Sequence, residues 1–138
     1  MISVLIYIES RFPTDRAIIR KFVNNHLKEK IRRDLEVGVS IVGDRKMKSL
    51  NMKYRNIPET TDVLSFPLDD PSSSTRKDIE AGFSPEMSAP DDLLRLGDVV
   101  VSYPQAVMDA VTDNKLVDQK LEELVCHGLD HLMGIHHE

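Results

Sequence analysis

Short runs of β-branched and aliphatic residues alternate along this chain with segments in which apolar residues recur every three or four positions. The short runs predict strands, because β-branched side chains favour extended backbone, and the longer spacing predicts amphipathic helices. The expected element order is βαβαββαα, which is typical of an α+β fold with a small mixed sheet of four strands covered by helices. The expected strands are residues 2–8, 37–42, 62–67 and 96–102.

Four helices are expected between and after these strands. Thr14 is the expected N-cap of the first helix, Asp44 of the second and Asp113 of the last, because their side-chain oxygens can accept the free N–H groups of a first turn. Pro104 suits the first turn of the third helix, which should reach about Val111. The expected buried positions are Ala17, Ile18, Phe22, Val23 and Leu27 in the first helix and Met47, Leu50 and Tyr54 in the second.

The composition is that of one folded domain. The chain has 138 residues, of which 41% are hydrophobic and 30% charged, so we expect a single domain over residues 1–138. Residues 69–92 form a polar segment rich in serine and proline, which we expect to be a mobile loop. The sequence lacks an apolar run of about 20 residues and a secretory signal, and the single cysteine, Cys126, suits a reducing cytosol. We therefore expect a cytoplasmic protein that does not contact membranes.

Charge is distributed unevenly along the chain. Residues 1–56 contain 13 Lys and Arg against 6 Asp and Glu, whereas residues 57–138 contain 5 against 17. A basic surface can bind a polyanion even though the whole chain has a net charge of -5, because phosphate binding depends on local charge. The asymmetry permits an RNA or DNA partner, and it is also compatible with ordinary solvated helix faces.

Four of the five histidines fall within the last twelve residues. His127 and His131 are one helical turn apart, so their rings project from one side of the expected last helix and can share a metal ion. This helix should run to about Met133 and end at Gly134, which can adopt the left-handed backbone that turns the chain back. A third histidine just past the turn can complete a site with three nitrogen ligands and a fourth position for water, as in catalytic zinc sites.

The same helix should pack one apolar side against the core, with both histidines at the edge of that side. Cys126 and Asp130 point elsewhere and are not expected to be ligands. Glu123, one turn before His127, is either an acceptor for a ligand histidine or a solvated side chain. The expected core positions are Val117, Leu121, Leu124, Val125, Gly128 and Leu132.

The histidine spacing resembles the HExxHxxGxxH pattern of metzincin proteases. Those proteases use the glutamate as a general base, and this chain has Gly128 at that position. A peptidase is therefore the least favoured function.

Three motifs together resemble the YbeY family of bacterial ribosomal-RNA maturation endoribonucleases. They are residues 50–67, including Tyr54-Arg55 and Thr61 to Pro67, then Leu96-Gly97-Asp98, and the histidine motif, in the same order over roughly residues 37–137. The resemblance implies an α+β fold, one zinc ion per chain held by His127, His131 and His137, and hydrolysis of single-stranded RNA. It also implies that Arg55 acts in catalysis. Family members usually have Asp where this chain has His136, so His136 is an alternative third ligand.

Two functions from different classes follow. The first is a zinc-dependent, single-strand-specific endoribonuclease that processes ribosomal RNA, in which Arg55 stabilises negative charge on the phosphate. The alternative is a non-catalytic ribosome-assembly factor that binds RNA or ribosomal particles and uses zinc only for stability.

Asp62 and Asp98, at the expected strand starts, are predicted to bond backbone N–H groups. Ser65 lacks the partners of a nucleophilic serine.

Overall fold

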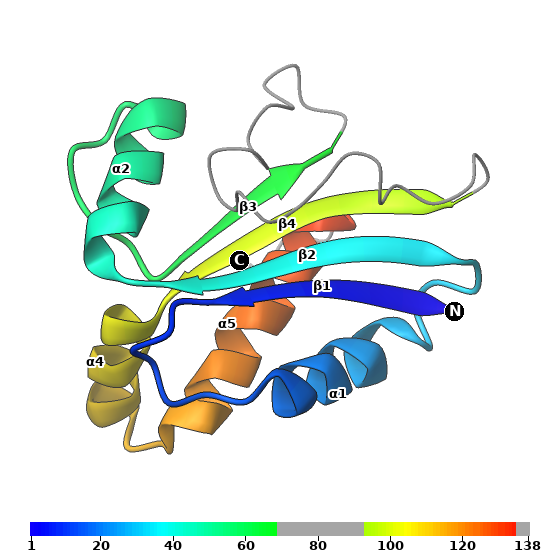
Figure 1. The fold of residues 1–138 in the computed structure, drawn as a ribbon, viewed down its shortest axis with the longest axis horizontal. Coiled ribbons are helices and arrows are strands. Elements are labelled where there is room, and N and C mark those ends of the chain that lie inside the picture. Colours follow the sequence, from blue (N-terminus) through cyan, green and yellow to red (C-terminus); the bar gives the residue numbers. More distant parts are fainter. Residues whose placement is uncertain (69–92, 135–138) are drawn as a thin grey trace.

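The computed structural model describes residues 1–68 and 93–134. Within these residues the elements follow the predicted order (Figure 1), and their mixed sheet and helices confirm the expected α+β architecture. The expected loop over residues 69–92 and the last four residues, which include His136 and His137, lie outside the described residues. The strands are β1 (Ile2–Ile8), β2 (Leu35–Val42), β3 (Val63–Pro67) and β4 (Leu94–Ser102). The helices are α1 (Arg16–Leu27), α2 (Asp44–Arg55), α4 (Tyr103–Asp113) and α5 (Val117–Leu132).

The strands form one sheet in the order β1-β2-β4-β3. β1, β2 and β4 are parallel, and β3 runs antiparallel to β4. β2 is buried along its whole length and β4 along most of it, because helices cover both faces of the sheet. β3 lies at the edge of this sheet, which leaves room for a site along its outer side.

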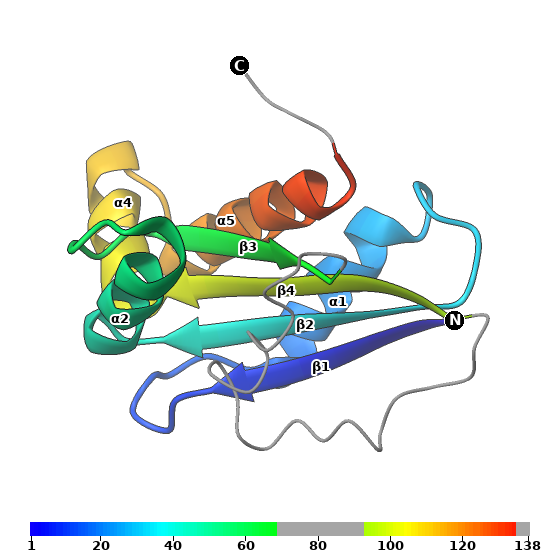
Figure 2. The ribbon, with the colours of Figure 1, turned by 90° about the horizontal axis from the view of Figure 1, so that it is seen from above.

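The two faces of the sheet carry different helices. α1 and α5 pack on one face, where Val39 and Val99 belong to the larger core cluster. α2 packs on the other face, where Met47 and Leu50 meet Val100. Figure 2 shows α5 and α2 on opposite sides of the strands. The basic residues of α1 and α2 therefore lie on opposite sides of the molecule and do not form one continuous surface.

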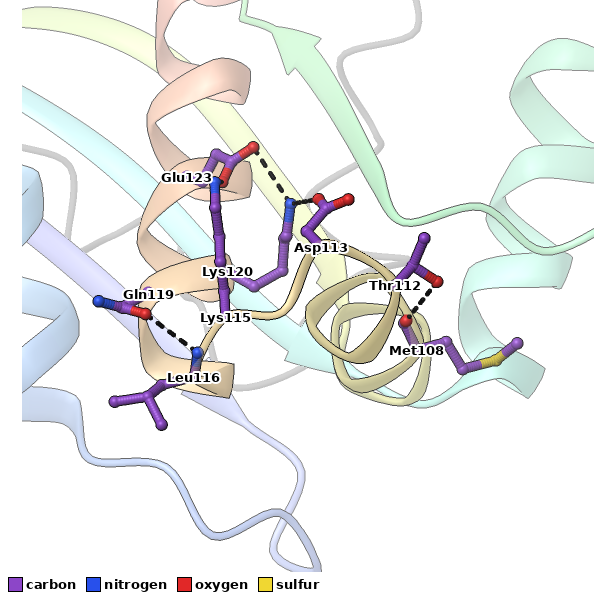
Figure 3. Close-up of polar contacts among 8 residues, drawn as sticks. All are labelled: Met108, Thr112, Asp113, Lys115, Leu116, Gln119, Lys120 and Glu123. Atoms are coloured by element: carbon purple, nitrogen blue, oxygen red, sulfur yellow. Dashed lines mark hydrogen bonds and ion pairs between the residues drawn. The ribbon is translucent and has the colours of Figure 1, made fainter.

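The helix starts differ from the sequence prediction by one to three residues. The N-cap of α1 is Asp15, whose carboxylate accepts the N–H of Ala17 at 2.8 Å, and Thr14 lies outside the helix. α2 is capped by Gly43, so Asp44 is its first residue. Asp113 is the last residue of α4, and α5 starts after Leu116, whose N–H is accepted by the Gln119 side chain at 3.0 Å (Figure 3).

The buried side of α1 also differs from the prediction. Ile18 is 44% exposed, whereas Ile19 is fully buried with Phe22, Val23 and Leu27. Ala17 is exposed as well, so the prediction was wrong for both residues of the first turn, and Ile19 takes their place in the core. No helix among the described residues is long and apolar enough to cross a membrane.

Asp44 fixes the beginning of α2 to its neighbours. One of its carboxylate oxygens accepts hydrogen bonds from Ser102 at 2.8 Å, from Thr60 at 3.0 Å and from Gln105 at 3.2 Å. The segment around Thr60 and the junction of β4 with α4 thus converge on one carboxylate, which sets the direction in which α2 leaves the sheet. That direction matters because Arg55 is the last residue of α2.

Candidate active site

α5 presents its two histidines as the spacing predicts. The ring centroids of His127 and His131 are 4.5 Å apart, and the rings are tilted by 50°. His127 is partly buried and His131 is exposed, so the pair lies where the core meets solvent. Two imidazoles so close on one helix can turn toward a single ion, and neutral imidazole is a common zinc ligand.

Gly128 lets this part of α5 lie close to the sheet. A Cβ atom at this position would stand 2.6 Å from Cγ1 and 3.0 Å from Cγ2 of Val99, and 3.4 Å from Cγ2 of Val63. Any larger residue would push the histidines away from β3 and β4. Gly128, the residue after His127, is therefore required for close packing. The larger glutamate that the protease pattern has at this position would not fit against the sheet.

The histidines share one hollow with Arg55. The hollow has a volume of about 380 Å³ and combines the end of α2, the residues that open β3, and the last turns of α5. The structure thus brings together His127, His131 and Arg55, although the arginine is more than 70 positions from either histidine in the sequence. The lining residues are Arg55, Asp62, Val63, Leu64, Ser65, His127, Gly128 and His131.

The expected third histidine ligand falls beyond the part of the chain that the structure describes. α5 ends at Leu132, and Gly134 follows with a φ of 80°, which is the left-handed conformation expected for the turn. Among residues 1–68 and 93–134, no group of three His, Cys, Asp or Glu side chains is placed to hold a metal. The described donors that fit a metal ion are the two imidazoles of α5.

Asp62 lies in the hollow, which the sequence did not indicate. It precedes β3, and its backbone carbonyl accepts the N–H of Ser102 at 2.9 Å. Burial, together with the hydrogen bond and the negative charge of Asp62, raises the pKa of Asp109. Asp62 therefore lines the hollow, and its side chain meets a second carboxyl group, that of Asp109 on α4.

The other two strand residues differ in position. Ser65 lines the hollow from β3, whereas Asp98 is buried in the middle of β4, opposite Phe66. β4 begins at Leu94, so Asp98 does not start the strand as the sequence predicted.

Two residues beside the histidines in sequence point away from them. Asp130 is buried and lies 2.7 Å from Nε2 of His26, which ties α5 to α1. Burial raises the pKa of the Cys126 thiol to about 11, so this thiol stays protonated near neutral pH and is a poor metal ligand. His26 is 104 positions from its partner, and the sequence carries no local signal for this contact.

Glu123 lies one turn before His127 on α5 and is engaged by two lysines. Its carboxylate accepts hydrogen bonds from Lys115 at 2.6 Å and from Lys120 at 3.1 Å, and Lys120 also bonds Asp113 (Figure 3). The Glu123 side chain is 48% exposed, as expected for the solvated alternative, and it takes part in an ion-pair cluster that joins α4 to α5.

Comparison with known proteins identifies the family. The family model described as "Endoribonuclease YbeY" matches residues 8–138, which include every described element except β1, of which only the last residue is matched. The chain belongs to the YbeY endoribonuclease family. This confirms the resemblance that the three sequence motifs indicated.

Individual YbeY relatives are similar over most of this chain. A relative from Dehalococcoides mccartyi strain 195, named "Endoribonuclease YbeY", is 40% identical over 106 residues, which cover 75% of this chain and 58% of the relative. A relative of the same name from Anaeromyxobacter sp. strain Fw109-5 is 36% identical, and the match covers 78% of this chain and 46% of the relative. One from Acinetobacter baumannii is 31% identical, and the match covers 89% of this chain and 70% of the relative. The chain thus spans about 60% of the length of the first of these YbeY relatives.

A solved structure shares the fold. The solution structure of TM1509 from Thermotoga maritima matches with a TM-score of 0.57 at 23% identity, covering 100% of this chain and 75% of that chain. At this identity the match supports the arrangement of helices and strands, and function rests on the site.

Proposed function

We propose that this chain is a zinc-dependent endoribonuclease that cleaves single-stranded RNA in the maturation of ribosomal RNA. The observation that supports this best is the hollow that Arg55 shares with His127 and His131. A cation beside two candidate metal ligands suits a reaction in which negative charge builds up on a phosphate. The name "Endoribonuclease YbeY" of the relatives supports the same reaction class.

His127 and His131 would hold one zinc ion per chain, with His137 as the third ligand and His136 as the alternative. Bound zinc supplies a Lewis acid for a phosphoryl oxygen and lowers the pKa of a bound water. The two described imidazoles fit this role because they lie on one face of α5 and open into one hollow. Gly134, with a φ of 80°, has the left-handed conformation that ends a helix with a turn.

Arg55 would bind two oxygens of the phosphate that is cleaved. A guanidinium group suits this task because its planar N–H groups can contact two oxygens at once. Asp62 would accept a hydrogen bond from a hydroxyl group of the substrate in the same hollow. These assignments give opposite tasks to the two charged side chains of the hollow: Arg55 holds the phosphate and Asp62 orients a neighbouring hydroxyl group.

The proposed substrate places the protein in the cytoplasm, where ribosomal particles are assembled and their RNA is accessible. Ribosomal proteins or particles are candidate partners at this stage. The basic residues of α2, which ends at Arg55, support an RNA partner by their local charge.

The proposal is tested by cleavage of a single-stranded ribosomal RNA fragment with purified protein of measured zinc content. His131→Ala should lose both bound zinc and cleavage. Arg55→Gln should keep its zinc and lose cleavage by a factor of about 100–1,000, the usual effect of removing one charge-stabilising group. Arg20→Gln is the matched control, since Arg20 is an exposed arginine on α1, across the sheet from α2.

The outcomes separate the two functions. If wild-type protein with zinc binds the RNA without cutting it, the assembly-factor function is correct and the nuclease proposal fails. If His131→Ala retains zinc and full cleavage, the chemistry is located elsewhere in the chain.

A further inference from the structure

A second polar hollow lies at the opposite end of α2 from Arg55. It has a volume of about 560 Å³ and lies between the segment after β1 and the first turns of α2. Three of its seven lining residues are cationic and two are serines, a composition that suits an anion. The lining residues are Tyr7, Glu9, Ser10, Arg11, Arg45, Lys46 and Ser49.

The one acidic residue of this lining already has cationic and N–H partners. The Glu9 carboxylate accepts the N–H of Gly43 at 3.0 Å and lies 3.2 Å from the Arg11 guanidinium. Gly43 makes room for this arrangement, because a Cβ atom there would stand 1.9 Å from a guanidinium nitrogen of Arg11. Arg11 balances Glu9, so Arg45 and Lys46 give the lining of the hollow a net positive charge.

The outer side of α2 connects this hollow to the active-site hollow. At 3.6 residues per turn, Arg45, Lys48, Met52 and Arg55 fall on the same exposed side of the helix. The only acidic residue of α2, Asp44, is turned toward Ser102 and its neighbours. A polyanion can therefore follow α2 from one hollow to the other without passing a carboxylate of this helix.

We propose that the hollow lined by Arg45 and Lys46 binds a backbone phosphate of the RNA strand whose cleavage site lies beside Arg55. This deepens the proposed function and rests on it. Ten residues separate Arg45 from Arg55, which corresponds to about 15 Å along the helix. At about 3.4 Å per nucleotide of a stacked strand, the second phosphate lies about four nucleotides from the cleavage site.

The distance predicts a dependence on substrate length. RNA that extends at least about five nucleotides from the cleavage site toward this hollow should gain affinity from it, and shorter RNA should not. For single strands, each phosphate contact contributes about 0.7 to the slope of log affinity against log salt. At about 0.1 M salt this corresponds to a factor of about five per contact, so losing the one phosphate contact should weaken binding about fivefold.

The test compares Arg45→Gln/Lys46→Gln with the matched control Arg20→Gln/Lys21→Gln. Both variants remove an adjacent Arg-Lys pair, the first from α2 and the second from α1 on the other face of the sheet. Arg45, Arg20 and Lys21 are exposed, and Lys46 is half-buried. Binding of fluorescent single-stranded RNA is measured in the His131→Ala background, so that affinity is observed without cleavage. The probes are a three-nucleotide RNA and RNAs extended by ten nucleotides on the 5′ or the 3′ side.

The α2 variant should bind one of the two extended RNAs about fivefold more weakly, with a salt slope reduced by about 0.7, and should bind the short RNA normally. The control should change both affinities by less than threefold. Equal binding of the extended RNAs by both variants would overturn the proposal, as would an equal loss on the short RNA. Because binding is measured without cleavage, the affinities would still test the second phosphate site if the nuclease function proved wrong.

Discussion

The close contact between Gly128 and Val99 predicts that Gly128→Ala lowers the unfolding free energy of the wild-type protein. In a variant with a smaller residue at position 99, the same change should raise it. In the wild-type protein the new methyl group would stand 2.6 Å from Cγ1 of Val99. Val99 is fully buried and β-branched, so its side chain cannot rotate away, and overpacking of this kind costs about 1–3 kcal/mol. Alanine in a helix is favoured over glycine by about 0.8–1.0 kcal/mol. The net effect is a loss of up to about 2 kcal/mol of unfolding free energy.

Val99→Ala removes both methyl groups that cause the clash. Alone it should cost about 1.6 kcal/mol for two buried methyl groups, plus the cost of the cavity. Adding Gly128→Ala to this variant then fills space and improves helix propensity, which should stabilise the protein by about 1–2 kcal/mol. The double-mutant cycle should therefore give a coupling of about 1–4 kcal/mol between the two positions.

The assay is urea unfolding followed by circular dichroism, with a chelator present because a bound metal would stabilise the native state. Asn25→Ala is the control, since Asn25 is an exposed position of α1 and should give the same small change in both backgrounds. An equal effect of Gly128→Ala in the wild-type protein and in the Val99→Ala variant would refute the close approach of α5 to the sheet.

Two further changes test contacts that support α5. His26→Ala removes the 2.7 Å contact with Asp130 and should lower the unfolding free energy by about 1–3 kcal/mol in urea unfolding; wild-type stability would contradict this. Lys120 lowers the pKa of Asp113 from its ordinary value of 3.8, and Lys115 and Lys120 lower the pKa of Glu123 from its ordinary value of 4.5. The stability that these pairs contribute is therefore present above the ordinary pKa values and is lost as the pH falls through the lowered ones. Lys120→Met should therefore reduce the melting temperature at pH 7 and have less effect near pH 3; an equal effect at both pH values would argue against the ion pairs.

Features set by neighbouring residues could be predicted from the sequence. The strands and helices follow from local apolar periodicity, and the pairing of His127 with His131 follows from the geometry of one helix turn. Gly128 was expected on the buried side of that helix, and it is buried. The helix starts were less predictable, because Thr14 and Asp15 are adjacent and both can cap a helix.

Features set by distant residues could not be predicted in the same way. Arg55 lines the hollow with the histidines because α2 ends beside β3. The family resemblance implied a catalytic role for Arg55, but the sequence did not show that it lies near the histidines. Asp62 was expected to be structural because a carboxylate before a strand usually bonds nearby backbone. Its place in the hollow depends on α5 packing along the edge strand β3, a contact between segments far apart in the sequence.

Zinc reconstitution of RNA cleavage tests the central claim most directly. Metal-free protein is titrated with zinc while the cleavage rate of a single-stranded ribosomal RNA fragment is measured, with His131→Ala in parallel. The account predicts that the rate rises to a plateau at one zinc ion per wild-type chain and stays at background in His131→Ala. Full cleavage by the metal-free protein, or the same titration curve for His131→Ala, would contradict it.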